Sequence, residues 1–151
     1  MPIIYLSPST QENNYYVSGG TEEQYMNLLA DKMIPYLDAS GIRYVRNTPD
    51  MTAASSIAAS NAGNYDLHLA LHSNAAPEGR YGQARGSIVF YYPGSAQGQE
   101  AARLIANGLK AIYPLPNLVR AQPTTAIGEV RRVRAPSAFL ELAFHDNEAD
   151  A

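Results

Sequence analysis

The sequence predicts a layered α/β domain with a largely parallel sheet, and three observations lead to this fold class. Six short segments, most of them apolar, are bounded by turn-forming residues, as strands usually are. Three segments with the features of helices lie among them. Strands that alternate with helices favour parallel pairing in one sheet. The length of 151 residues favours a single domain, residues 1–151, with one substantial core.

The individual elements follow from local patterns. Thr21 is a suitable cap for a first helix, whose apolar residues recur at helical spacing until Gly41 ends it. A second helix, rich in Ala and Ser, is expected from a cap at Asp50 to about Ala62, and a third helix is expected over 99–113. The polar loop 7–20 is long, and such loops in compact domains are often functional. The predicted strands cover residues 2–6, 42–45, 65–72, 86–92, 128–133 and 137–144.

Composition excludes several classes of protein. The net charge of −3 argues against a nucleic-acid binder, which usually presents a basic face. Arg131, Arg132 and Arg134 are interpreted as a solvated edge rather than a basic site. Because the chain has no cysteine, it has no disulfide, thiolate nucleophile or Cys-bound zinc. No apolar run approaches the ~20 residues of a membrane span, and the start lacks the features of a signal peptide.

The segment LHLALHSNAAP, residues 67–77, carries two histidines where a strand that only filled a core would carry Val or Ile. His68 and His72 share one face of the strand, roughly 13 Å apart, so they are too distant to bind one ion easily. His72 lies where the chain leaves the sheet, and strand ends border the ligand crevice of open α/β sheets. His72 is therefore a candidate metal ligand, although a structural role is open. His68 is interpreted as a hydrogen-bonded structural residue.

Two glutamates add to the candidate site. Glu141 lies within the apolar strand AFLELAF, where a carboxylate is costly unless it is paired or bound. Burial would raise the pKa of Glu141, as a general base near neutral pH requires, and a salt bridge to an arginine is the structural alternative. Glu23 follows the polar loop in the first turn of a helix, where an ordinary acidic residue is also common. With His72, these carboxylates match a catalytic zinc site with a position open for water.

These residues resemble a known family, the zinc-dependent N-acetylmuramoyl-L-alanine amidases of the amidase 3 type. The resemblance runs along nearly the whole chain. Glu23 in EEQYMNLLA is similar to the metal-binding glutamate of the family, and NAGNYDLHLALHSNA to the segment with its metal-binding histidine. GSIVFYYP resembles the Gly-led strand of the family. APSAFLELAFHDN is similar to the strand that carries its catalytic glutamate. His72-Ser73-Asn74-Ala75 together with Glu141 is the specific part.

The resemblance implies a three-layer fold, a twisted, mostly parallel six-stranded sheet with helices on both faces. It implies peptidoglycan as the substrate and hydrolysis of the amide between N-acetylmuramic acid and L-alanine. Zn²⁺ would be held by Glu23 and His72, and Glu141 would take a proton from water and pass it to the leaving amine. Such an enzyme is expected outside the cell or in the cell wall.

The sequence departs from the family pattern in two places. The family has a metal-binding histidine just after the first strand, whereas this chain has SPSTQE there, with Thr10 at the nearest position, and no histidine precedes His68. Gln11 is favoured slightly as the third metal ligand, and His145 is the alternative ligand. A further possibility is that the site binds metal weakly or not at all. The final C-terminal helix of the family is expected to be missing, which would expose an apolar face.

Two other functions remain open at this point. A non-catalytic peptidoglycan-binding relative with a degenerate metal site is favoured by the absent first histidine, whereas the glutamate in the sixth strand argues against it. A zinc exopeptidase is the other alternative, because sites with two protein ligands and a glutamate base recur on α/β folds. Product analysis on muropeptides distinguishes the exopeptidase from the amidase.

Overall fold

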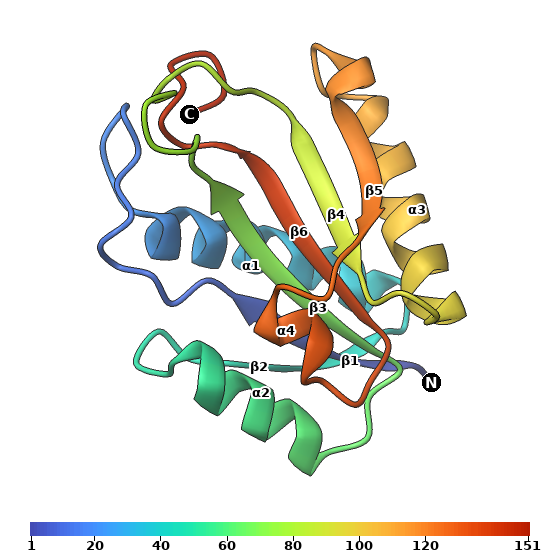
Figure 1. Ribbon diagram of the computed structural model, residues 1–151. Coiled ribbons are helices and arrows are strands. Elements are labelled where there is room, and N and C mark those ends of the chain that lie inside the picture. The colour runs from blue at the N-terminus through green and yellow to red at the C-terminus, as the bar shows by residue number, and fades with distance from the viewer.

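The computed structural model describes all residues from 1 to 151 as one six-stranded sheet with helices on both of its faces (Figure 1). The strand order is β2-β1-β3-β6-β4-β5. All neighbouring strands are parallel except β4 and β6, which pair antiparallel. The predicted fold class is therefore confirmed. The strands are β1 (Ile3–Pro8), β2 (Arg43–Arg46), β3 (Leu67–Asn74), β4 (Ser87–Tyr91), β5 (Val119–Pro123) and β6 (Ser137–Phe144).

Helices α1 (Glu22–Ala39) and α3 (Ala96–Lys110) cover one face of the sheet (Figure 1). Alternate strand residues, Leu69 and Leu71 of β3 among them, join the buried side chains of these two helices in a core cluster of 11 residues. Helix α2 (Ala53–Ala62) and the short helix α4 (Gly128–Arg131) lie on the opposite face. On that face β3 presents His68, Ala70 and His72, so the main apolar core and the polar residues occupy opposite sides of one strand.

Side-chain caps explain where the helices begin. Thr21 and Gln24 form a reciprocal capping box at α1, and Thr52 and Ser55 form another at α2. The cap of α2 is therefore Thr52 rather than the predicted Asp50. Helix α3 begins after Ser95, whose hydroxyl accepts a hydrogen bond from the amide of Gly98.

The predicted strand over 128–133 is wrong. Residues Gly128–Arg131 form α4, closed by hydrogen bonds from the amides of Arg131 and Arg132 to the carbonyls of Ile127 and Gly128. This single turn buries Glu129 and Val130, whereas a strand would place these neighbours on opposite faces. The strand that the sequence did not predict is β5, a polar strand at the edge of the sheet. Arg131, Arg132 and Arg134 are exposed, in agreement with solvated charges.

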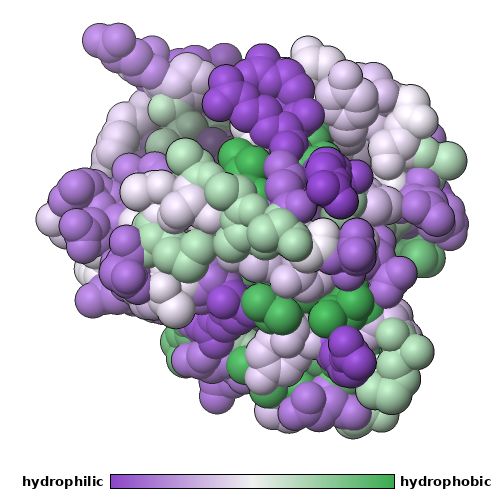
Figure 2. All heavy atoms as spheres, turned by 90° about the horizontal axis from the view of Figure 1, so that it is seen from below, coloured by the Kyte–Doolittle hydropathy of each residue, from purple (hydrophilic) through white to green (hydrophobic).

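The surface carries apolar side chains in limited areas. In the view from below, where α2 and β2 lie, hydrophobic residues form small groups separated by hydrophilic ones (Figure 2). A more apolar groove of about 410 Å³ lies between α1 and the end of β6, and Leu28 on its wall is 50% exposed. No helix has both the length and the apolar character that crossing a membrane requires.

Candidate active site

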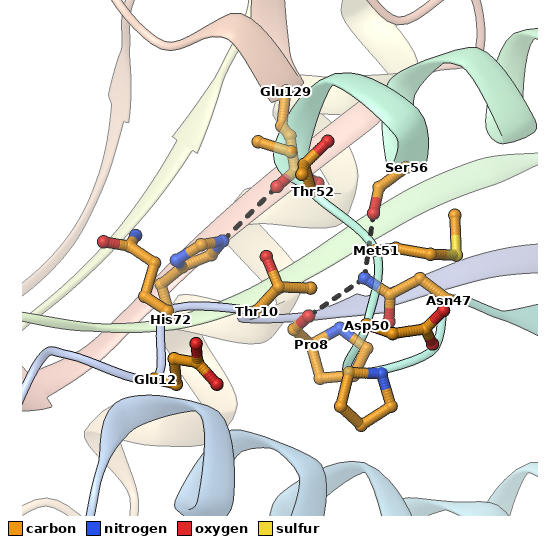
Figure 3. A pocket seen from close by; sticks show the side chains of 13 residues that line it. Pro8, Thr10, Glu12, Asn47, Asp50, Met51, Thr52, Ser56, His72 and Glu129 are labelled. Carbon is orange, nitrogen blue, oxygen red and sulfur yellow. Dashed lines mark hydrogen bonds and ion pairs between the residues drawn. The ribbon is translucent and has the colours of Figure 1, made fainter.

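A pocket of about 390 Å³ opens where β1, β2 and β3 end (Figure 3). Its wall includes residues that follow β1, residues at the start of α2, and two buried ionisable side chains, His72 and Glu129. Carboxyl ends of parallel strands are the usual ligand-binding edge of open α/β sheets. The candidate site is therefore at the edge of the sheet that the sequence predicted.

His72 lies between two carboxylates. Its Nδ1 is 2.9 Å from Oε1 of Glu22, and its Nε2 is 3.4 Å from Oε1 of Glu129. The imidazole stacks on the ring of Phe139 with centroids 4.3 Å apart. Burial lowers the pKa of His72, but the neighbouring carboxylates of Glu129 and Glu22 outweigh burial and raise this pKa to about 9. Without a metal ion, His72 is consequently a buried cation held by two anions.

The structure brings Glu22, and not Glu23, to His72. Glu22 is 1% exposed, and its carboxylate also accepts hydrogen bonds from Nδ2 of Asn14 at 2.7 Å and from the amide of Ser73 at 3.2 Å. Burial raises the pKa of Glu22, and the bonds to His72 and Asn14 more than offset that effect, so this pKa is lowered. Glu23 is half-buried and makes no side-chain hydrogen bond or ion pair in the structure.

A sequence signal for Glu22 existed. Glu22, Met26 and Ala30 are the buried residues of α1, and their spacing of four residues places them on one stripe of the helix. That stripe extends back to Glu22, whereas Glu23 lies about 100° further around the helix axis.

Glu141 lies beside His72 on the same face of the sheet, as the register of β3 and β6 pairs these two residues. Burial is the main effect on Glu141 and raises its pKa to about 7. The charge of His72 lowers this pKa, and the charge of Glu22 raises it. The pKa therefore has the direction that the sequence analysis predicted. A carboxyl group that titrates near neutral pH is suited to accept a proton from water and release it again.

Gln11 belongs to the same polar cluster. Nδ2 of Asn14 donates one hydrogen bond to Oε1 of Gln11 and another to Oε2 of Glu22, each 2.7 Å long. The loop after β1 thus brings an amide oxygen close to Glu22, and Thr10 lines the pocket beside it.

His145, the alternative ligand, lies elsewhere. Its Nδ1 is 2.8 Å from Oγ of Ser73, and its ring packs near Tyr16. The hydrogen bonds and ion pairs of His72 are with Glu22 and Glu129, and none joins it to His145. The structure therefore does not bring His145 to His72.

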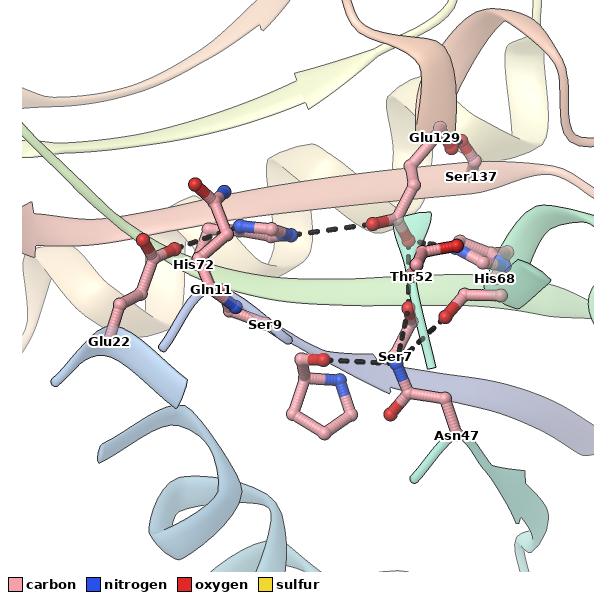
Figure 4. A network of polar contacts seen from close by, with 12 residues as sticks. Ser7, Ser9, Gln11, Glu22, Asn47, Thr52, His68, His72, Glu129 and Ser137 are labelled. Atoms are coloured by element: carbon pink, nitrogen blue, oxygen red, sulfur yellow. Dashed lines mark hydrogen bonds and ion pairs between the residues drawn. The ribbon is translucent and has the colours of Figure 1, made fainter. Parts of the chain in front are cut away.

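Glu129 is the site residue that sequence reasoning missed. This carboxylate is 5% exposed and joins both histidines of β3 (Figure 4). Its Oε2 accepts hydrogen bonds from Oγ of Ser7 and Nε2 of His68, each at 2.8 Å. Burial raises the pKa of Glu129, but bonding to His68 and His72 lowers it to about 2. His68 has the hydrogen-bonded structural position that was predicted, since its Nδ1 contacts Oγ of Ser60 at 2.9 Å.

The donor atoms suit zinc, although they are few. Glu22 and His72 supply a carboxylate and an imidazole whose donor atoms are 2.9 Å apart, and Gln11 supplies a nearby amide oxygen. No three His, Cys, Asp or Glu side chains form a metal-binding group. The fit is therefore that of a site with two strong protein ligands and one weaker ligand.

A sequence model of a known family matches residues 9–151, and its description is N-acetylmuramoyl-L-alanine amidase, of the amidase 3 type. The chain belongs to this family. Its members are hydrolases of peptidoglycan, generally depend on zinc, and are typically secreted or associated with the cell wall. No curated protein matches the sequence of this amidase.

Solved structures of two amidases and of the catalytic domain of an endolysin share the fold. An N-acetylmuramoyl-L-alanine amidase from Clostridium difficile 630 has a TM-score of 0.83 and 16% identity, over 99% of this chain and 83% of that chain. AmiC2 of Nostoc punctiforme has a TM-score of 0.81 and 13% identity, with coverages of 97% and 82%. The catalytic domain of the CD27L endolysin targeting Clostridia difficile has a TM-score of 0.78 and 22% identity, with coverages of 99% and 85%. At such identities the likeness shows the fold alone.

The pKa values of this amidase predict how its stability depends on pH when metal is removed. Folding raises the pKa of Glu141 from 4.5 to about 7 and that of His72 from 6.5 to about 9. A raised pKa stabilises the fold below the unfolded value and loses this contribution as pH rises through the folded value. In chelator, the melting temperature is therefore expected to fall between about pH 4.5 and pH 9. Thermal unfolding followed by circular dichroism measures this, and a rise over that range would contradict it.

Proposed function

We propose that this amidase cleaves the bond between the lactyl group of N-acetylmuramic acid and L-alanine with the aid of one Zn²⁺. The observation that carries the proposal is the convergence of three ionisable side chains from different elements. His72 has one ring nitrogen 2.9 Å from Glu22, and Glu141 is its register partner on the neighbouring strand. Peptidoglycan is the macromolecular partner, and the proposed site of action is outside the cytoplasm, in the cell wall.

Glu22 and His72 would hold the metal, and Gln11 would supply the third protein oxygen. Glu22 takes the place that the sequence analysis gave to Glu23, because Glu22 is the buried carboxylate next to His72. When bound, zinc supplies Lewis-acid polarisation of the amide carbonyl and lowers the pKa of water.

Side chains of the protein carry out the proton transfers and orient the proposed ligands. The ionised carboxylate of Glu141 accepts a proton from the attacking water, and protonated Glu141 then donates it to the nitrogen of the leaving L-alanine. Its pKa of about 7 makes both transfers accessible near neutral pH. The hydrogen bonds from Asn14 and Ser73 keep the Glu22 carboxylate oriented toward His72.

The test is product analysis on defined muropeptides in zinc-containing buffer. An amidase releases intact stem peptides that begin with a free L-alanine amine, together with sugar chains whose N-acetylmuramic acid residues carry a free lactyl carboxylate. Mass spectrometry identifies both products. Free amino acids cut from the peptide end would identify an exopeptidase instead.

One observation favours the non-catalytic alternative. No three His, Cys, Asp or Glu side chains form a metal-binding group. Sedimentation of the chain with peptidoglycan, without any released product at saturating zinc, would establish a binding protein and contradict the proposed hydrolysis. The burial of Glu141 with a raised pKa argues against this alternative, because a binding surface gains nothing from a carboxylate held in that environment.

Neighbouring glutamates provide a matched test of the metal ligand. We expect Glu22→Gln to weaken zinc binding by at least about tenfold, because the buried carboxylate next to His72 is lost. Glu23→Gln is the control, since the same chemical change one residue later leaves Nδ1 of His72 with its partner. Competition with a chromogenic chelator measures both affinities. Weaker binding in Glu23→Gln than in Glu22→Gln would restore the assignment made from sequence.

A further inference from the structure

Glu129 has an unusual position for a carboxylate that the proposed chemistry does not use. It comes from the single turn of α4 and is buried between two histidines of β3, His68 and His72 (Figure 4). A buried charge is costly unless several donors surround it. Glu129 is therefore held in place by specific partners, and these define the direction in which each of its oxygens points.

The two oxygens of Glu129 have different partners. Oε2 accepts from Ser7 and from Nε2 of His68, each at 2.8 Å. His68 is fully buried, stacks on Tyr5 and has its other nitrogen against Ser60, so it is fixed on all sides. Oε1 faces only Nε2 of His72, at 3.4 Å.

His72 shows the complementary arrangement. Its Nδ1 is engaged by Glu22 at 2.9 Å, whereas its buried Nε2 has no hydrogen-bond partner. The oxygen of Glu129 is the charged acceptor facing that nitrogen, at an ion-pair distance with poor alignment for a hydrogen bond. Metal-binding histidines commonly donate the other ring N–H to a carboxylate, which fixes the tautomer and makes the ligand more basic.

We propose that Glu129 is a positioning residue that accepts the Nε2–H of His72 and leaves Nδ1 as the nitrogen that binds metal beside Glu22. This inference rests on the proposed zinc-dependent function. Hydrogen bonds from Ser7 and His68 fix the carboxylate of Glu129. Glu129 in turn orients the imidazole of His72, which would bind the ion. The polar residues of β1, β3 and α4 thus form one support for a site that lacks the usual first histidine.

Metal affinity provides the first test. Zinc dissociation constants are measured by chelator competition for the wild-type chain, Glu129→Gln and Val130→Ala. Val130 is the matched control, because it is a buried neighbour in α4 that packs with Ala70 and Phe139 and has no polar atom in its side chain to accept the Nε2–H of His72. Glu129→Gln is expected to weaken zinc binding about 10–100-fold. Val130→Ala is expected to lower the melting temperature and leave zinc affinity unchanged.

Nitrogen NMR of the zinc-loaded wild type provides the second test and does not depend on any variant that folds poorly. Long-range ¹H–¹⁵N spectra of the imidazoles are expected to show that Nε2 of His72 carries the proton and Nδ1 binds metal. Metal on Nε2 would overturn the proposal. Equal zinc affinity in Glu129→Gln and wild type, or an equal loss in Val130→Ala, would overturn it while the proposed function stands. A wild-type chain that binds no zinc would overturn both.

Discussion

Replacement of Glu141 by glutamine is expected to lower amide hydrolysis by about 10²–10⁴-fold, the usual contribution of a general acid–base group. Glutamine keeps the size of the side chain beside His72 but cannot take or return a proton. Zinc affinity should persist, because the ligands of the proposed site lie on other elements. The measurement is the rate of stem-peptide release at saturating zinc, with zinc content determined on the same sample.

The pH profile of the wild type gives an independent signature of Glu141. Its pKa of about 7 is raised mainly by burial, and a bound cation nearby would lower it. Hydrolysis should therefore rise with pH on an acidic limb at or below about pH 7, as the carboxylate ionises. Glu100→Gln, an exposed change on α3, is the control and should retain this profile. Wild-type activity in Glu141→Gln would remove Glu141 from the mechanism.

The fold could be predicted from sequence because its elements are locally encoded. Five of the six predicted strands coincide with β1, β2, β3, β4 and β6, whose apolar residues and bounding turns are visible in the chain. The antiparallel direction of β4 was not predictable from such patterns, since it depends on how the chain crosses the sheet after β3. Segment 128–133 was mistaken for a strand because one helical turn is too short to show a helical period.

The site was predictable only in part, and for a different reason. His72 and Glu141 stand out because polar residues interrupt apolar strands, which is costly without a purpose. Glu129 lies in a polar segment and has no such contrast. Its burial depends on His68, 61 residues away, and on Ser7, 122 residues away. Glu22 and Glu23 differ in their angle around α1, and only the four-residue spacing of Glu22 from the buried Met26 distinguishes them in the sequence.

His72→Ala is expected to abolish detectable zinc binding and hydrolysis, and also to destabilise the fold. The change removes the only imidazole of the proposed site. It also leaves the buried carboxylates of Glu22 and Glu129 without their shared cation. Removal of one partner from a buried ion pair typically costs about 3–5 kcal/mol. Elemental analysis and chemical denaturation measure the two effects separately, and unchanged zinc content would contradict the assigned ligand.

The pH dependence of His72→Ala distinguishes lost charge from lost packing. The imidazole fills space against Phe139, so part of the destabilisation is a cavity that does not depend on pH. Without the imidazole, the pKa values of Glu22 and Glu129 would instead rise above their wild-type values, because one of the groups that offset burial is lost, while Glu129 keeps its bond to His68. As the pH falls and these carboxylates bind protons, the difference in stability between His72→Ala and the wild type is therefore expected to become smaller. His72→Gln, which fills more of the cavity, should show the same pH-dependent part. A loss of stability that is equal at every pH would mean that His72 contributes packing alone, and that its two carboxylates do not depend on its charge.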